Sequence, residues 1–345
     1  MLKPAMKQMP EGKKERPEVS LVIIALNEEK SLPKLLQDIQ SQTFEHDKIE
    51  IILVDGMSED RTRSIMEDFA QTYDFYDIIC QNNPKIIQAS GWNTGIQHST
   101  GKVIIRLDAH ARLPEDFIEK CIAYIKQGHD ICGGKVKNYV PEKTKWSLVV
   151  NMAEDSMFGG SIAAFRHKDE AGYVDTLAFA ACKREIFEKI GSFNEKLLRT
   201  EDNEMHYRMR KAGYKFYYTP DIMSYRETRP TFKKLLRQKY LNGYWVGLTV
   251  KICPKCFSIY HFVPLMFVLG IVGTTICSCM GLWQLAAVMW GLYGLFDVVM
   301  SVASCFAGAE KSIYCLMLPI LFLVLHVGYG LGTLKGILLS PWILK

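Results

Sequence analysis

The chain has 345 residues, of which 48% are hydrophobic, and a formal net charge of +5. This length fits one large domain or two smaller ones. No charged side chain occurs from Phe257 to Phe296 or from Ser312 to Leu334. Because a membrane span needs about 20 apolar residues, a transmembrane region is predicted at 257–345, with spans near 257–279, 283–305 and 312–334. An apolar hairpin buried in a soluble protein is the alternative, but a chain of this size has little room to bury one.

The segments that flank the predicted spans indicate which side of the membrane they face. Residues 1–17 form a predicted tail of mixed charge without the apolar stretch of a secretory signal peptide. Seven basic residues and no acidic residue lie between Thr228 and Cys256, which is the positive-inside pattern. We therefore expect a multi-pass plasma-membrane protein whose larger N-terminal part is cytoplasmic. The basic residues favour contact with anionic membrane lipids, and nucleic acid is not an expected partner.

The same basic segment has helical spacing. Apolar and aromatic residues from Phe232 to Leu248 recur at helical intervals among the basic residues. This pattern predicts an amphipathic basic helix at 229–256 that lies on the membrane surface, and a helix that packs against the soluble domain is the alternative. Cys253 and Cys256 have the spacing of a zinc or redox motif, but no second pair accompanies them in the soluble part.

Strands and helices alternate along the first part of the chain. Continuous apolar runs predict buried parallel strands, and these lie at 19–25, 49–54, 76–80 and 103–107. Helical spacing predicts helices between them and after the last one, at 31–42, 58–69, 85–97 and 114–127. This alternation indicates an α/β fold with a doubly wound sheet. Shorter strands are predicted at 131–139, 172–178 and 215–218, and a further helix at 201–212.

Two acidic residues follow predicted parallel strands, and this is where such sheets bind nucleotides. Asp55 could accept a hydrogen bond from a base or a ribose, or it could cap a helix. Asp108 and His110 could bind one divalent ion, Mn²⁺ or Mg²⁺, which would neutralise a diphosphate leaving group. The alternative for His110 is a hydrogen bond to neighbouring backbone.

The segment Thr200–Asp202 adds two carboxylates at a predicted helix start. One of them could take the proton from an attacking hydroxyl group. The same two acids could instead only complement the helix dipole.

Four segments resemble, in order and spacing, the motifs of family 2 glycosyltransferases of the GT-A fold. They are Val22–Glu29, Val54–Thr62, Asp108–His110 and Thr200–Asp202. The resemblance covers about residues 18–225, so a GT-A domain is expected at 18–228. Three further segments resemble the bacterial branch that builds succinoglycan and related exopolysaccharides and carries C-terminal spans. They are Phe158–Ser161, Val174–Thr176, and Arg237 and Gln238 with Gly243 and Trp245.

The resemblance implies a role for each matching position. The residues implied to bind the nucleotide sugar are Ala25, Asn27, Glu28, Asp55, Lys85, Gln88, Asn93 and Asp108. Asp108 and His110 stand at the metal motif, and Asp202 stands at the catalytic base with Glu201 beside it. The residues on the acceptor side are Gly159, Gly160, Asp175, Arg237, Gln238 and Trp245.

The sequence departs from the family pattern in three places. His110 replaces the second acid of the metal motif, and Gly56 replaces the second acid of an Asp-Asp pair. The Gln-x-x-Arg-Trp motif of processive synthases is absent, and the nearest segment is 238–242. With only three predicted spans as well, a processive, polymer-exporting enzyme is not expected.

The resemblance implies a membrane-anchored, inverting glycosyltransferase that acts in exopolysaccharide, capsule or cell-surface glycan synthesis. The expected donor is a UDP-sugar, with UDP-glucose as one candidate, and the expected acceptor is a polyprenyl-diphosphate-linked saccharide. Other glycan-assembly enzymes are candidate partners. Three alternatives stay open: a polyprenyl-phosphate sugar synthase, a processive synthase, and a catalytically silent membrane scaffold. The last predicted span could cross the membrane fully, re-enter it or lie on its surface, because Lys335 and Lys345 oppose a full crossing.

Overall fold

The computed structural model describes residues 15–160, 162–228, 231–307 and 313–343. The described residues divide into two compact units. The first lies within Met1–Lys137 and Ala163–Glu227, and the second within Asn138–Ile162 and Thr228–Lys345. Residues 1–14 of the predicted tail, Ser161 and Arg229 lie outside the described residues.

The first unit is built on one mixed sheet. Among the described residues, its strand order is β3-β2-β1-β4-β8-β6-β9-β5, and β7 pairs with β9. The strands are β1 (Val19–Ala25), β2 (Ile49–Asp55), β3 (Asp77–Asn82), β4 (Val103–Asp108), β5 (Ala111–Arg112), β6 (Ile131–Tyr139), β7 (Gly172–Val174), β8 (Ala181–Lys183) and β9 (Phe216–Glu227).

The parallel half of this sheet follows directly from the apolar runs. Every residue of β2 is buried, as are all but one of β1, which is the pattern of strands covered on both faces. β1 pairs in parallel with β2 and with β4, and β2 pairs in parallel with β3. β8 then joins β4 in the antiparallel sense. The predicted α/β fold class is confirmed.

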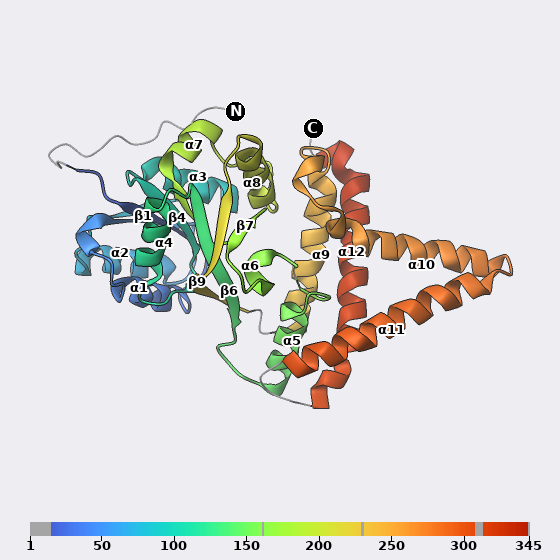
Figure 1. The fold of residues 1–345 in the computed structure, drawn as a ribbon. Helices are drawn as coiled ribbons and strands as arrows, with labels where there is room; N and C mark the ends of the chain where they lie inside the picture. The colour runs from blue at the N-terminus through green and yellow to red at the C-terminus, as the bar shows by residue number, and fades with distance from the viewer. Residues whose placement is uncertain (1–14, 161, 229–230, 308–312, 344–345) are drawn as a thin grey trace. The chain divides into compact units, whose positions relative to one another are not determined.

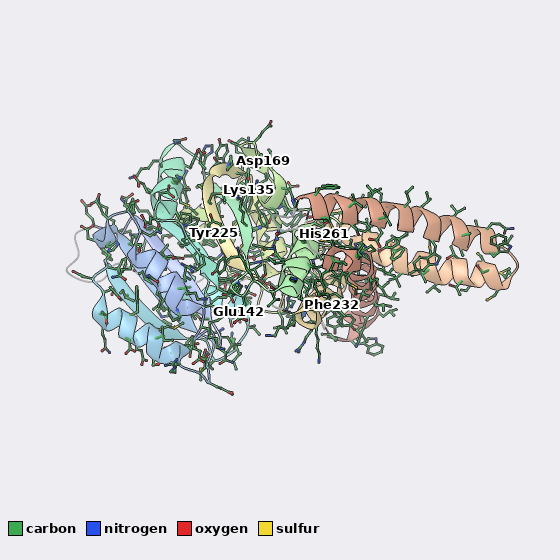
Figure 2. All side chains as sticks on the ribbon, turned by 90° about the horizontal axis from the view of Figure 1, so that it is seen from below. Lys135, Glu142, Asp169, Tyr225, Phe232 and His261 are labelled. Carbon is green, nitrogen blue, oxygen red and sulfur yellow. The ribbon has the colours of Figure 1, made fainter. Side chains whose placement is uncertain are left out.

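Helices cover both faces of this sheet (Figure 1). On one face, α1 (Leu32–Gln40), α2 (Thr62–Thr72) and α4 (Phe117–Lys126) pack on β1, β2 and β4. On the other, α3 (Gln88–His98), α7 (Arg184–Ile190) and α8 (Glu201–Lys211) pack on the same strands. Two short helices complete the unit, η1 (His46–Lys48) and α6 (Ala164–His167). Figure 2 labels Lys135 of β6 and Asp169, which form an ion pair.

The second unit is helical. Its helices are α5 (Lys145–Asp155), α9 (Phe232–Thr249), η2 (Pro254–Cys256), η3 (Ile259–Phe262), α10 (Val263–Cys279), α11 (Trp283–Ala307), η4 (Ile313–Met317) and α12 (Leu318–Ile343). Three segments are long and apolar enough to cross a membrane: Ile259–Cys279, Trp283–Ala307 and Ile313–Ser340. They confirm the three predicted apolar helices. α10 and α11 form a hairpin in Figure 1, and its side chains in Figure 2 are almost entirely carbon.

α9 and α12 pack side by side along their length (Figure 1). Glycines on both helices bring the backbones together. A Cβ atom at Gly243 would lie 2.1 Å from the carbonyl oxygen of Tyr329, and one at Gly247 would lie 2.3 Å from that of Thr333. From the other side, a Cβ atom at Gly332 would lie 2.2 Å from the carbonyl oxygen of Tyr240. Small residues four apart permit this approach in membrane helices, and the ascending pairs show that the helices run parallel.

Some elements differ from the sequence prediction. β9 has 12 residues instead of the four predicted at 215–218, and β7 ends at Val174 rather than at 178. α5, β8 and α7 were not predicted. The segment Asn138–Ile162, which carries α5, groups with the helices of the second unit.

Candidate active site

The carboxyl ends of three neighbouring parallel strands bring predicted site residues together. Ala25 at the end of β1 is the register partner of Asp55 at the end of β2. On the other side of β1, Asp108 at the end of β4 is the partner of Ile24. The two acids that the sequence singled out therefore flank the end of β1, at the sheet edge where parallel α/β folds bind nucleotides.

The loop after β1 is fixed to the loop after β2 by hydrogen bonds from backbone N–H groups to side-chain oxygens. Asn27 has a left-handed backbone with φ of 56°; its N–H donates to Ser58 Oγ at 2.9 Å, and its side-chain oxygen accepts from the Glu59 N–H. The Glu28 N–H donates to Thr62 Oγ1 at 2.8 Å. These contacts place Asn27 and Glu28 beside the ends of β1 and β2.

Asp55 is only 4% exposed. Its two carboxylate oxygens accept from the Ser58 N–H at 3.2 and 3.3 Å. Asp55 therefore stabilises the loop that follows β2, as a capping side chain does at a helix start. Contact with a nucleotide remains a prediction for this residue.

The predicted metal residues differ in their surroundings. The half-buried Asp108 carboxylate makes no hydrogen bond or ion pair with any other residue that the structure describes. His110 Nδ1 lies 3.2 Å from Glu28 Oε1. Burial disfavours the charged imidazole, but the Glu28 hydrogen bond and the charges of Asp108 and Glu28 outweigh this and raise the pKa of His110.

These side chains fit a divalent ion that is shared with a substrate. When His110 Nδ1 carries the hydrogen, it donates to Glu28 and Nε2 keeps its lone pair, as in metal sites where a carboxylate orients the histidine. No group of three or more His, Cys, Asp or Glu able to hold a metal occurs among the described residues. Asp108 and His110 would therefore supply two ligands, and phosphate oxygens and water the others. Such an ion stabilises negative charge on a diphosphate leaving group.

Glu201 and Asp202 lie at the start of α8. This helix packs on the face of the sheet to which the Arg106 side chain points. The side chains of β4 alternate, so Ile104, Arg106 and Asp108 point to the face that carries α3 and α8. Arg106 Nη1 lies 2.9 Å from Asp202 Oδ1. The side chain of Asp202 is nevertheless 47% exposed, whereas Glu201 is buried at 4% exposure.

This environment separates the two carboxylates chemically. Burial would raise the pKa of Asp202, but the positive charge of Arg106, which forms an ion pair with it, lowers it. Burial and the charge of Asp202 raise the pKa of Glu201 to about 8, and Asp108 adds to this shift. Asp202 is therefore the ionised acid of the pair at neutral pH. The negative charge of Asp108 also acts on Glu201.

The side chains of Lys85 and Asn93 both contact the segment 193–195, which precedes α8. Lys85 Nζ lies 2.5 Å from Glu195 Oε2. The side-chain amide of Asn93 donates to Glu195 Oε1 at 2.9 Å and to the Phe193 carbonyl at 3.1 Å. Gln88 is exposed at the start of α3. These contacts join α3 to the chain before α8, and the predicted nucleotide contacts remain predictions.

The acceptor-side residues fall in both units. In the first, Asp175 is 86% exposed, and its carbonyl accepts from Arg210 of α8. In the second, a Cβ atom at Gly159 would lie 2.5 Å from the Ala153 carbonyl oxygen, and one at Gly160 would lie 1.9 Å from that of Glu154. Lys239 Nζ donates to the Gly160 carbonyl at 3.1 Å. The glycines therefore let the loop fold back tightly on α5.

Three other acceptor-side residues lie on α9. Trp245 is buried at 9% exposure, Arg237 is exposed, and Gln238 is intermediate.

The family relationship agrees with this geometry. Residues 20–191 match the family model described as glycosyl transferase family 2. The chain contains a family 2 glycosyltransferase domain.

Two relatives of this glycosyltransferase match over nearly its whole length. The dolichyl N-acetyl-alpha-D-glucosaminyl phosphate 3-beta-D-2,3-diacetamido-2,3-dideoxy-beta-D-glucuronosyltransferase of Methanococcus voltae is 24% identical, over 93% of this chain and 97% of the relative. The succinoglycan biosynthesis protein ExoA of Rhizobium meliloti is 22% identical, over 92% of this chain and 94% of the relative.

A solved structure shows the same fold. The mannosyltransferase PcManGT of Pyrobaculum calidifontis, in complex with GDP-Man and Mn²⁺, aligns with a TM-score of 0.53 at 18% identity. The alignment covers 96% of this chain and 89% of that one.

Three residues that contact the candidate site, Arg106, Trp92 and Phe193, were not predicted from the sequence. Arg106 lies between two aromatic rings, with its guanidinium carbon 5.0 Å from the centre of Trp92 and 4.5 Å from that of Phe193. One signal was available in the sequence, because Arg106 is a charged residue inside the apolar run 103–107 and precedes Asp108 by two positions. The rings come from distant segments, so no local pattern identifies them.

Proposed function

We propose that this enzyme transfers a sugar from a nucleoside diphosphate sugar to a polyprenyl-linked saccharide at the cytoplasmic face of a membrane, with inversion at the anomeric carbon. The proposed donor is a UDP-sugar, with UDP-glucose as one candidate. The carrying observation is the carboxylate arrangement. Among the described residues, the Asp108 carboxylate makes no hydrogen bond or ion pair, and Glu201 and Asp202 lie on the same face of β4.

In the proposed reaction, Asp202 accepts the proton of the acceptor hydroxyl as this group attacks the anomeric carbon. General bases of this kind contribute about 10²- to 10⁴-fold. Its lowered pKa keeps it ionised at neutral pH. Asp108 and His110 would hold the divalent ion at the diphosphate. One displacement breaks the bond from sugar to diphosphate and forms the glycosidic bond, which inverts the configuration.

A lipid-linked acceptor is supported by three candidate membrane-spanning helices and by the relative whose name specifies a dolichyl-phosphate-linked sugar. The exposed basic residues of α9 favour a cytoplasmic orientation, and we propose that they contact anionic lipids. They are Lys233, Lys234 and Arg237.

The test is nucleotide release by the full-length protein in detergent, from UDP-sugars and GDP-mannose, with Mn²⁺, Mg²⁺ or chelator. Each donor is assayed with and without a lipid extract that contains polyprenyl-linked saccharides. We expect lipid-stimulated, metal-dependent release from one donor, and a product whose anomeric configuration by NMR is opposite to that of the donor. Absence of release from every donor would overturn the proposal.

The variant Asp202→Asn separates this function from a polyprenyl-phosphate sugar synthase. A phosphate acceptor needs no general base, so such a synthase would keep most of its activity. For a hydroxyl acceptor, we expect a loss of at least about 100-fold in kcat with UDP binding unchanged. The matched control is Asp169→Asn, an acid of the first unit with no role in the site and a side chain that is 84% exposed, which should keep its donor-dependent release.

A further inference from the structure

We propose that Arg106 is a positioning residue of the transfer reaction, which holds one oxygen of the Asp202 carboxylate so that the other faces the acceptor. This inference rests on the proposed function, because it takes Asp202 as the base. It adds a residue from the interior of the sheet to a site otherwise built from strand ends and the start of α8.

The first support is the asymmetry of the Asp202 carboxylate. Oδ1 forms an ion pair with Arg106 Nη1 at 2.9 Å. Among the described residues it accepts no hydrogen bond, and it is shielded from solvent, although the side chain as a whole is 47% exposed. The exposed surface therefore belongs to the rest of the side chain, on the Oδ2 side. A carboxylate held through one oxygen presents the other in a defined direction, which is what proton transfer requires.

The second support is that Arg106 is itself immobilised. Its side chain is 15% exposed, and its guanidinium lies against Trp92 of α3 and against Phe193. Both rings are 3% exposed. Arginine stacks on aromatic rings with a fixed plane and donates from a rigid fork, so this cage fixes the direction from which Asp202 is held.

The third support is that the buried histidine of α8 does not compete with Arg106 as the cation beside Asp202. His206 lies one turn after Asp202, is buried, and lies 2.8 Å through Nδ1 from Thr176 Oγ1. Burial, together with the charges of Arg106 and Arg210, lowers the pKa of His206 to about 4. His206 is therefore neutral at physiological pH, and Arg106 is the cation in contact with Asp202.

The competing role for Arg106 is direct contact with the donor diphosphate. Arg106 and Asp108 point to the same face of β4, two residues apart, with Arg106 further from the strand end. The ion pair and the aromatic cage direct the guanidinium toward α8 instead. The two roles predict different effects on nucleotide affinity, which makes them distinguishable.

The experiment compares Arg106→Met and Arg106→Lys with the wild-type, full-length protein. Wild-type release from the preferred donor is measured first, and its absence would overturn the proposed function and this role with it. For Arg106→Met, we expect kcat to fall by at least about 10-fold, a part of what a general base contributes, while the Kd of UDP stays within about 2-fold of the wild-type value. Arg106→Lys should be intermediate, because it keeps the charge and loses the fork.

Two controls separate positioning from stability. Arg184→Met removes another buried arginine, which contacts Ser99 and Glu188 beside the start of β4, and should leave kcat per folded molecule unchanged. Adding Arg106→Met to Asp202→Asn should cause no further loss, because the two residues act as one unit.

Two results would overturn the inference. An unchanged kcat in Arg106→Met would show that Asp202 is held without it. A rise in the Kd of UDP that matches the fall in kcat would assign Arg106 to the diphosphate.

Discussion

The substitution Gly332→Ala should weaken the pairing of α9 and α12. The added methyl group would lie 2.2 Å from the Tyr240 carbonyl oxygen and 3.0 Å from the Tyr244 nitrogen. Both are backbone atoms that no side-chain rotation can move. Ordinary contact begins at 3.4 Å, so the two backbones must separate by about 1 Å. Overpacking of this kind costs about 1–3 kcal/mol, and we expect the variant to be less stable by that amount.

The matched control is Gly291→Ala on α11, where, apart from its chain neighbours and the adjacent helix backbone, no described atom lies within 4 Å of the added methyl group. Alanine is a better helix former than glycine by up to about 1 kcal/mol, so this variant should be neutral or more stable. Both variants are compared by thermal unfolding of the full chain in one detergent. The packing argument fails if the two midpoints shift in the same direction and by the same amount.

A second glycine between α9 and α12 tests whether one substitution separates the two helices along their length. Gly247→Ala would place its methyl group 2.3 Å from the Thr333 carbonyl oxygen. Once one substitution has separated the helices, the second costs less. The double variant should therefore lose less stability than the two single losses combined, and full additivity would show that each glycine acts locally.

Three further predictions concern single residues. Asp108→Ala should abolish the metal-dependent part of the affinity for UDP, which is the part that a chelator removes from the wild type. The affinities are measured by calorimetry with and without metal. If both match the wild-type values, this carboxylate is not a metal ligand. Because the pKa of Glu201 is raised to about 8 in the folded protein from about 4.3 when unfolded, its contribution to stability falls as pH rises through that window. Between pH 5 and pH 8.5, the thermal unfolding midpoint of Glu201→Gln should therefore rise relative to that of the wild type. A difference between the two midpoints that does not change with pH would contradict the raised pKa. His326→Phe removes the contacts to the Phe158 carbonyl at 2.7 Å and to the Tyr293 hydroxyl at 2.9 Å, so it should lower the free energy of unfolding by about 1–3 kcal/mol. Tyr293→Phe removes only one of these contacts and should lower it by less. Equal losses in the two variants would contradict this prediction.

The sequence predicts the parallel half of the sheet well because its strands are buried on both faces. Continuous apolar runs locate β1, β2 and β4 to within one residue. β9 was predicted too short, because Pro220 and Asp221 interrupt the strand pattern. β8 has three residues, which is too short for any periodicity to register.

Long-range contacts explain what the sequence could not predict in the candidate site. The strand ends that carry Asp55 and Asp108 follow from local patterns. The ion pair of Arg106 with Asp202 joins positions 96 residues apart, and the Trp92 ring joins them from a third segment. Similarly, the spacing of Gly328, Gly332 and Gly336 suggests close packing of α12, but does not identify α9 as the partner.

The pairing of α9 with α12 also sets an order for biosynthesis. Gly332 follows Gly247 by 85 positions, so at about 5–20 residues per second the ribosome needs roughly 4–17 s to make the partner of an already completed α9. During that interval the glycine face of α9 has no helix against it, while the sheet of the first unit is already complete in the nascent chain. A chain that stops before α12 would leave this face of α9 without its partner helix.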